Sequence, residues 1–456
     1  MENPIKKLLA GKVASKIKDA LPLDAGDAAL NGLIGTLIAN PGRTEQVFGT
    51  GEIFLIKAAL YLTGVRLEPS AYVGVGTIHK ELIGVYQFDL NLGKTDDRPP
   101  LPSELALPHG LHVPIVVNDA SPFSLLREKG TLYLKVSGMK LFPVEYEKRP
   151  LFYDKKTSDG IEMWKLAQHR LGDELMVTYN TYCHTLKGGN QCRFCGLNQN
   201  EPIHRRKNSY FIQTPEQIAE IAEAAYGEGI AKRLEITGGI LPKRAEVDFI
   251  IAVGNAVKAR LGTKTVPGGH ALLAAPNDLS QIDRLKEAGW EYVFFNLEVW
   301  NPHFFAGLCP GKEAIVGREH WLKALDYAVE VFGKGNVRSI LIAGLEPLNS
   351  YLEGAEYLTE HGIFADPSPW MPMPGSLMEG QSTPSAGWHI NLLVQTLDLW
   401  ERHGWDLRDV AKDGWLSFND LAAMRLQVRR AKEDNPALDL EKDLRYQLSV
   451  KGNLDF

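Results

Sequence analysis

The chain has 456 residues, of which 44% are hydrophobic and 23% are charged, and its formal net charge is −6. This length allows two or three domains with buried cores, and the composition is that of an ordinary globular protein. The weak negative charge and the lack of a long basic run argue against nucleic acid as a partner.

The first residues predict neither export nor membrane insertion. Segment 1–23 carries lysines but no continuous apolar core of the kind that signal peptides have. The most apolar early run, 30–39, is too short to span a bilayer. Four cysteines argue against a disulfide scaffold, and their clustering indicates a metal site in a reducing compartment. We therefore expect a cytoplasmic protein without a membrane partner.

Residues 1–171 predict a separate N-terminal α+β domain. A helical opening precedes strand-like stretches at 83–93, 112–119 and 131–138, and a proline-rich loop is expected at 94–108. No motif in this part assigns a function. Such a domain is a candidate for binding or capping a substrate.

Residues 172–405 predict six strand–helix units. Short apolar, β-branched runs alternate with longer amphipathic runs, which is typical of a parallel sheet covered by helices. Thr214 suits the N-cap of the first helix, and Pro215 suits its first turn. The strands are expected at 174–182, 233–239, 270–276, 292–300, 337–344 and 363–370, and the helices at 214–229, 245–262, 278–289, 318–333, 347–362 and 386–404.

Six units are too few for a closed eightfold barrel. An open, partial barrel is therefore the expected α/β fold of this part. Residues 406–456 predict a C-terminal helical extension with a helix at 417–435, in which Ser417 and Asp420 are placed as a capping box.

Three of the four cysteines cluster in a polar, glycine-rich stretch directly after the first of these strands. Cys183, Cys192 and Cys195 have the spacing C-x8-C-x2-C. In β/α arrays, chemistry gathers where loops leave the carboxyl ends of the strands. Three thiolates can hold three irons of a [4Fe–4S] cluster and leave the fourth iron open for a ligand. Two other interpretations remain open: a zinc site completed by His184 or His204, and structural cysteines without a ligand.

With this cysteine pattern, the chain resembles the radical SAM superfamily. Members carry three cysteines after the first strand of a partial (β/α)6 barrel, usually spaced C-x3-C-x2-C with an aromatic residue before the last cysteine. Phe194 occupies the aromatic position here. The first spacer departs from the family pattern, since it has eight residues instead of three.

Other segments resemble the SAM-binding elements of that family, in the same order along the chain. Thr237, Gly238 and Gly239 follow the second strand, where the family backbone receives the methionine amino group of SAM. The resemblance implies that Glu298 binds the ribose hydroxyls and that Arg318 clamps the SAM carboxylate, with Lys312 as the next candidate for the clamp. This acid–arginine pair is similar to the biotin synthase and hydrogenase-maturase branch.

The last two strands also carry family-like loops. "SILIAGLEP" resembles a segment beside the adenine of SAM, and "PWMPMPGS", with Met373, resembles another. Cys309, the remaining cysteine, lies in the expected loop after the fourth strand. It is a candidate catalytic residue, as a hydrogen-atom donor or a covalent partner, and the competing interpretation is a small semi-buried residue.

The resemblance implies a [4Fe–4S] cluster and S-adenosylmethionine as cofactors, and an external one-electron reductant of the flavodoxin or ferredoxin type. Reductive cleavage of SAM would give a 5′-deoxyadenosyl radical that acts on an unidentified small-molecule substrate. One alternative is cleavage toward the amino-acid side, with transfer of an aminocarboxypropyl group. Another is a zinc-stapled binding module without catalysis.

Overall fold

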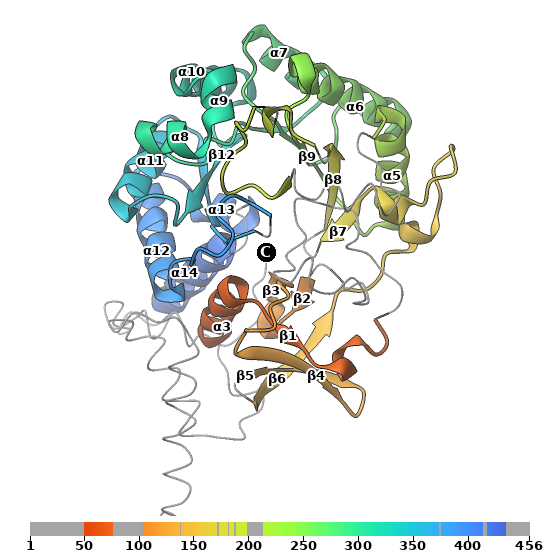
Figure 1. Cartoon of the computed structure of the whole chain (residues 1–456), viewed down its shortest axis with the longest axis vertical. Helices are drawn as coiled ribbons and strands as arrows, with labels where there is room; N and C mark the ends of the chain where they lie inside the picture. The colour runs from red at the N-terminus through yellow and green to blue at the C-terminus, as the bar shows by residue number, and fades with distance from the viewer. Residues whose placement is uncertain are drawn as a thin grey trace, which may run out of the picture.

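The computed structural model shows two sheets, a smaller one between residues 66 and 146 and a larger one between residues 168 and 369, with helices around the larger one (Figure 1). The described residues are 50–75, 102, 104–136, 138–170, 173–180, 182–186, 188–197, 213–373, 375–413 and 417–434.

The N-terminal part combines helix α3 with a sheet. Within the described residues this sheet has six strands in the order β1-β4-β5-β6-β2-β3. All neighbours are antiparallel except β1 and β4. The elements are α3 (Thr50–Thr63), β1 (Arg66–Leu67), β2 (Glu104–Ala106), β3 (His112–Pro114), β4 (Phe123–Glu128), β5 (Thr131–Val136) and β6 (Met139–Tyr146).

The second sheet is an open barrel wall. In the described part of the chain its order is β13-β12-β11-β10-β9-β8-β7. Strands β8 to β13 run parallel, and β7 is antiparallel at the edge beside β8. The strands are β7 (Gln168–Arg170), β8 (Glu174–Asn180), β9 (Arg233–Gly238), β10 (Gly269–Leu272), β11 (Tyr292–Phe294), β12 (Val337–Ala343) and β13 (Phe364–Pro369).

Helices connect these strands and lie outside the curved sheet, which Figure 1 shows from α5 round to α12. None of the described helices is long and apolar enough to cross a membrane. The helices are α5 (Pro215–Glu228), α6 (Glu246–Leu261), α7 (Ser280–Glu287), α8 (Pro302–Leu308), α9 (Pro310–Ile315), α10 (Arg318–Phe332), α11 (Leu348–Glu360), α12 (Ala386–Arg402), α13 (Leu407–Asp413) and α14 (Ser417–Asp434).

The fold is a partial (β/α)6 barrel with an α+β N-terminal part and C-terminal helices, and the predicted fold class is confirmed. Helix α5 starts as expected, because Thr214 and Gln217 form a reciprocal capping box and Pro215 follows the cap. The boundaries proposed at 171/172 and 405/406 stay predictions. Strand β7 lies before the 171/172 boundary in the sequence, but it is part of the barrel sheet.

Two local predictions were wrong. The proline-rich segment 94–108 was expected to be a loop throughout, yet β2 lies inside it; the stretch 83–93 lies outside the described residues. The region between the fourth strand and α10 was expected to be a loop, yet it forms α8 and α9, each of which begins at a proline. Proline suits the first turn of a helix, so these residues start the two helices.

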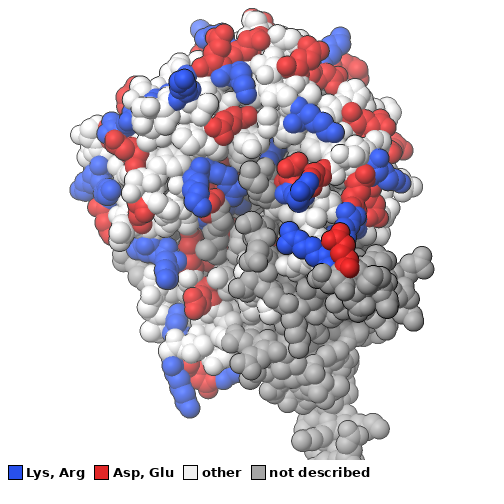
Figure 2. Space-filling model, turned by 180° about the vertical axis from the view of Figure 1, so that it is seen from behind, with Lys and Arg blue, Asp and Glu red and all other residues white. Residues whose placement is uncertain are grey.

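A buried ion pair joins the two ends of the described chain. Lys57 on α3 and Asp420 on α14 form a salt bridge, and each side chain is 2% exposed. Asp420 therefore binds a lysine of the N-terminal part. The capping box with Ser417 stays a prediction, because the side chain of Ser417 lies outside the described residues. On the face opposite to Figure 1, positive and negative side chains are interspersed over the described surface (Figure 2).

We expect Lys57→Met to lower the thermal unfolding midpoint, because it leaves the Asp420 carboxylate buried and unpaired. Breaking such a buried pair costs about 3–5 kcal/mol, whereas breaking an exposed pair costs about 0–1 kcal/mol. Arg284→Met is the matched control, since Arg284 pairs with Asp248 on the surface. The double variant Lys57→Met/Asp420→Leu should recover most of the lost stability. Equal midpoints for Lys57→Met and Arg284→Met would contradict this account.

Candidate functional site

The cysteine loop begins at the carboxyl end of β8 and is held there by Asn180. The Asn180 side chain is fully buried, and its Oδ1 accepts a hydrogen bond of 3.0 Å from the backbone N–H of Tyr182. Its Nδ2 donates to the carbonyl of Gly239, at 3.2 Å, on the next strand. The N–H of His184 donates to the carbonyl of Ile240 at 2.8 Å. Cys183 is therefore fixed between the ends of β8 and β9.

The later part of the loop packs against the junction of α8 and α9. The N–H of Arg193 donates to the carbonyl of Leu308 at 2.9 Å, and its Nε donates to the carbonyl of Gly307 at 2.6 Å. A Cβ on Gly311 would lie 2.4 Å from the carbonyl oxygen of Asn190. The eight-residue spacer thus rests on two helices that the sequence did not predict.

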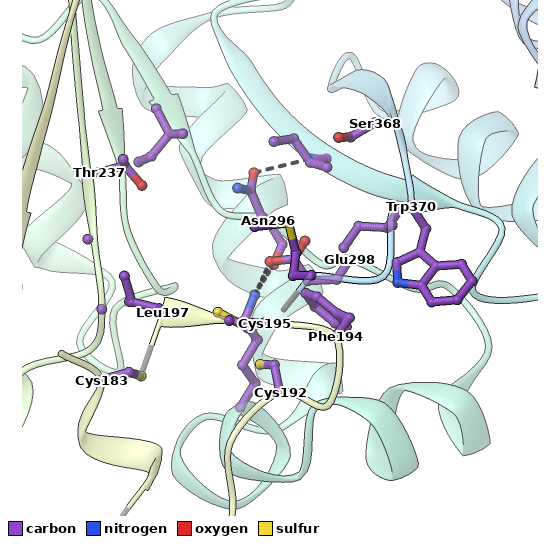
Figure 3. A pocket seen from close by; sticks show the side chains of 18 of the residues that line it. Cys183, Cys192, Phe194, Cys195, Leu197, Thr237, Asn296, Glu298, Ser368 and Trp370 are labelled. Carbon is purple, nitrogen blue, oxygen red and sulfur yellow. Dashed lines mark hydrogen bonds and ion pairs between the residues drawn. The ribbon is translucent and has the colours of Figure 1, made fainter. Parts of the chain in front are cut away.

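Figure 3 shows the side chains of Cys183, Cys192 and Cys195 along the wall of one pocket, with Phe194 beside them. Burial raises the pKa of the Cys183 thiol and raises that of Cys195 to about 12. The pKa of Cys192 is raised well above its ordinary value by a hydrogen bond with Cys309 and by burial. Without a metal these groups are thiols, and metal binding would release their protons.

Two glycines give the end of β9 its shape. A Cβ on Gly238 would lie 2.7 Å from the ring of Tyr179, and one on Gly239 would lie 2.1 Å from the carbonyl oxygen of Tyr182. Neither position has room for a side chain. The close approach therefore leaves backbone groups beside the cysteines, in the same pocket as Thr237.

Glu298 follows β11 and forms an ion pair inside the pocket wall. Its Oε1 accepts a hydrogen bond of 2.6 Å from Lys312 Nζ, and the two side chains are 13% and 12% exposed. Lys312 Nζ also donates to the carbonyl of Asn296 at 2.8 Å. Burial is the largest single effect and disfavours the ammonium charge, but Glu298, Cys192 and Cys309 together outweigh it, so the pKa of Lys312 is raised and the group stays charged.

The backbone of Glu298 adopts a positive φ of 73°. A non-glycine residue rarely adopts this left-handed conformation, which costs about 1–3 kcal/mol and tends to occur at binding and catalytic sites. An isolated bridge to Leu341 of β12 holds the strained segment. This backbone conformation places the Glu298 carboxylate next to Lys312 and in the pocket lining.

Arg318 and Cys309 lie apart from the pocket lining. The Arg318 guanidinium lies over the Trp300 ring, 4.5 Å from its centroid, and its Nε donates to the Trp300 carbonyl at 2.9 Å. Cys309 is fully buried at the junction of α8 and α9. Its thiol contacts Cys192 behind the pocket wall. The structure thus brings together the predicted site residues except these two.

The pocket has a volume of about 300 Å³, and residues from both the N-terminal part and the barrel line it. Most of its lining is apolar, and part of it comes from the N-terminal half of the chain, through Tyr61 and Pro114. Met373 and Trp370 close it after β13. The predicted residues in the lining are Cys183, Cys192, Phe194, Cys195, Thr237, Gly238, Gly239, Glu298 and Met373.

Comparison with known proteins assigns this site to a family. Residues 182–364 match the family model of the radical SAM superfamily. The chain carries a radical SAM domain. The matched residues begin just before Cys183 and end at the start of β13, so they contain the cysteine loop, both glycines, Glu298 and Lys312.

Relatives of the radical SAM domain include a curated protein and several solved structures. The chain is 29% identical over 243 residues to bacteriochlorophyllide c C-7(1)-hydroxylase of Chlorobaculum limnaeum, covering 51% of this chain and 60% of that protein. Methylornithine synthase matches with a TM-score of 0.40 and 17% identity, covering 54% of this chain and 69% of that one. The FeFe-hydrogenase maturase of Carboxydothermus hydrogenoformans matches with a TM-score of 0.39 and 16% identity, covering 53% and 56%.

The radical SAM family implies a [4Fe–4S] cluster and SAM, and the residues present fit both groups. Three thiols on one pocket wall are the donor set of a cluster with one open iron. The turn at Gly238 and Gly239 packs closely against Tyr179 and Tyr182 and lines the same pocket, so its backbone groups lie beside the cysteines. The charged pair Glu298–Lys312 offers an acceptor for hydroxyls and a cation for a carboxylate.

The sequence analysis missed three residues of the site, Asn180, Asn296 and Tyr61, and ranked a fourth, Lys312, behind Arg318. Asn180 and Asn296 carry no motif of their own, and their roles depend on which strands become neighbours. Lys312 stands in "GLCPGK", six residues before Arg318, and the sequence made it only the next candidate for the SAM carboxylate. Tyr61, from a distant part of the chain, offers no local signal of a place in the pocket.

We expect Gly239→Ala to impair cluster binding. The new Cβ would collide with the backbone that precedes Cys183, and forcing extra volume into a packed site costs about 1–3 kcal/mol. Gly227→Ala is the control, because a Cβ at this position of α5 meets nothing within 4 Å. Iron content after anaerobic reconstitution measures the effect. Full iron in Gly239→Ala would mean that the turn is not part of the site.

Proposed function

We propose that this chain is an iron–sulfur enzyme that binds a [4Fe–4S] cluster through Cys183, Cys192 and Cys195 and reductively cleaves SAM. The observation that carries the proposal is the meeting of these three cysteines with Gly239 and the Glu298–Lys312 pair in one pocket of a radical SAM domain. The cluster would supply low-potential electron transfer from an external one-electron reductant. The product would be a 5′-deoxyadenosyl radical that abstracts hydrogen from a substrate.

The chain's own residues bind and orient SAM. We assign Glu298 to the ribose hydroxyls, because an ionised carboxylate accepts hydrogen bonds from such groups. Lys312 uses two of its three N–H donors on Asn296 and Glu298, so one remains for the SAM carboxylate. We favour Lys312 over Arg318 for this contact, because the Arg318 guanidinium stacks on Trp300 outside the pocket lining.

The lining supports a substrate with an apolar reacting part. Leu272 at the end of β10, Leu273 and Ala274 directly after it, and Tyr61 and Pro114 from the N-terminal part all line the same pocket. Apolar walls exclude water from a reactive intermediate. The relative from Chlorobaculum limnaeum is named for action on a bacteriochlorophyllide, so hydrophobic ring compounds are the first substrates to test.

Metal and sulfide analysis tests the proposal. Anaerobically reconstituted protein should be brown and hold about four irons and about four sulfides per chain. Colourless protein that keeps one zinc at the cysteines would instead support the zinc-stapled binding module. Hydrogen abstraction is then tested by incubation with a deuterated ring compound and measurement of deuterium in 5′-deoxyadenosine.

A further inference from the structure

A second, much smaller cavity lies beneath the pocket, inside the barrel. Its volume is about 10 Å³, which is room for one water molecule or one ion. Leu272 and Ile340 line both cavities and separate them. The small cavity contains no cysteine, so it is distinct from the candidate cluster site.

Three potential metal ligands converge on this cavity from three adjacent strands. Glu174 lies on β8, Glu235 on β9 and His270 on β10, and His270 stands directly opposite Glu235 in the register. They are 4%, 2% and 3% exposed. One ligand atom from each lies within 4.8 Å of the other two.

Two potential ligand atoms of these residues have no hydrogen-bond partner among the described residues. They are Oε1 of Glu235 and Nε2 of His270. A buried polar atom without a partner costs free energy, so such atoms in a native fold call for an explanation. A ligand in the cavity between them would satisfy both.

The protonation states suit a metal ligand set. Burial, reinforced by the charge of Glu174, raises the pKa of Glu235 to about 8. Burial lowers the pKa of His270 well below its ordinary value, so its imidazole is neutral and can ligate a metal. A divalent cation that binds Glu235 would release the proton of its carboxyl group, and the cation would then balance the carboxylate charge.

Arginines border the cluster, but each of their charges is balanced. The ion pairs are Arg170 with Glu104 and Glu174, Arg233 with Asp173, and Arg338 with Asp366. Glu235 takes part in none of these four ion pairs. Of the two glutamates in the cluster, it is therefore the one better placed to bind an added cation.

We propose that Glu174, Glu235 and His270 form a buried site for one divalent transition metal ion, with Zn²⁺ as the best match. Zinc takes imidazole and carboxylate ligands and is satisfied by three protein ligands and one water. Such an ion would join β8, β9 and β10 below the pocket and so support the strands that carry the cysteine loop and the glycine turn. The proposal does not depend on the proposed function.

Zinc analysis of the full-length holoenzyme tests this site. Protein reconstituted with iron and sulfide, exposed to Zn²⁺ and freed of loose metal by a chelator should retain about one zinc per chain beside its irons. Glu235→Gln is the key variant, because glutamine mimics the neutral acid and should leave the metal-free fold intact. It should lower bound zinc about tenfold or more while the iron content stays unchanged. His270→Gln should do the same.

His389→Gln is the matched control. His389 is equally buried and has an unpartnered Nδ1, but it lies on α12, outside the cluster. The His389→Gln variant should keep its bound zinc. Added zinc should also raise the unfolding midpoint of protein cleared of zinc beforehand, but not that of Glu235→Gln.

Two results would overturn the proposal. The first is wild-type protein with less than about one zinc in ten chains and no zinc-dependent shift in the midpoint, which would mean that the cavity holds only water. The second is zinc that survives Glu235→Gln and His270→Gln but disappears in Cys192→Ser. The iron and sulfide content of the same samples tests the proposed function separately.

Discussion

Replacing Cys183, Cys192 or Cys195 with alanine should abolish both the iron–sulfur absorbance and SAM cleavage. The three thiols are the cluster donors that the pocket offers, and a cluster that loses one of three ligands has no replacement in the lining. Anaerobic reconstitution followed by iron analysis, absorbance spectroscopy and nucleoside chromatography measures the effect. We expect activity to fall to the background of the buffer.

Cys309→Ala is the control for these variants. Cys309 is the same type of residue, is buried beside Cys192 and does not line the pocket. We expect it to retain the cluster and SAM cleavage. A Cys192→Ala variant with full iron, or a Cys309→Ala variant without iron, would show that the ligand assignment is incorrect. Loss of substrate turnover alone in Cys309→Ala would support a catalytic role for Cys309.

Lys312→Met should weaken SAM binding by about 10–100-fold, whereas Arg318→Met should leave it within about threefold. The loss of a hydrogen bond to a charged group corresponds to about 1.5–3 kcal/mol. Methionine matches the length of lysine without its charge. Equilibrium binding of SAM to reconstituted protein gives the affinities, and iron content must remain normal for the comparison to count.

Lys312→Met also leaves Glu298 without its ion-pair partner, so a second variant is needed. Lys312→Met/Glu298→Gln removes the unpaired charge and should restore stability without restoring SAM affinity. If Arg318→Met gives the loss and Lys312→Met does not, the carboxylate clamp belongs to Arg318, as the resemblance alone implied. The arginine would then have to leave Trp300 when SAM binds.

Local sequence signals predicted the barrel because each unit carries its own pattern. The apolar strand runs, the Thr214 cap and Gly229, which ends α5 in the left-handed conformation, are set by neighbours in the sequence. The cysteine cluster was equally visible, because its chemistry depends on spacing and on its place after the first barrel strand. These features needed no knowledge of distant contacts.

The remaining features depend on contacts between distant segments. The positive φ of Glu298 is held by its bridge to Leu341, and glutamate itself does not favour that conformation. The choice between Lys312 and Arg318 depends on how α9 and α10 turn against Trp300, which the helical patterns do not determine. Tyr61 reaches the pocket only because the N-terminal part packs against the barrel.

The nucleosides formed from SAM test the central claim most directly. Reconstituted enzyme is incubated anaerobically with SAM and dithionite, and the products are separated by chromatography, with Cys192→Ala as the blank. Glu298, Lys312 and the Gly238–Gly239 turn line one pocket. If they bind SAM as proposed, the ribose carbon is presented to the substrate, and the breaking bond must align with the electron donor. We predict 5′-deoxyadenosine as the dominant enzyme-dependent product. Dominant methylthioadenosine would contradict the account and would favour transfer of an aminocarboxypropyl group.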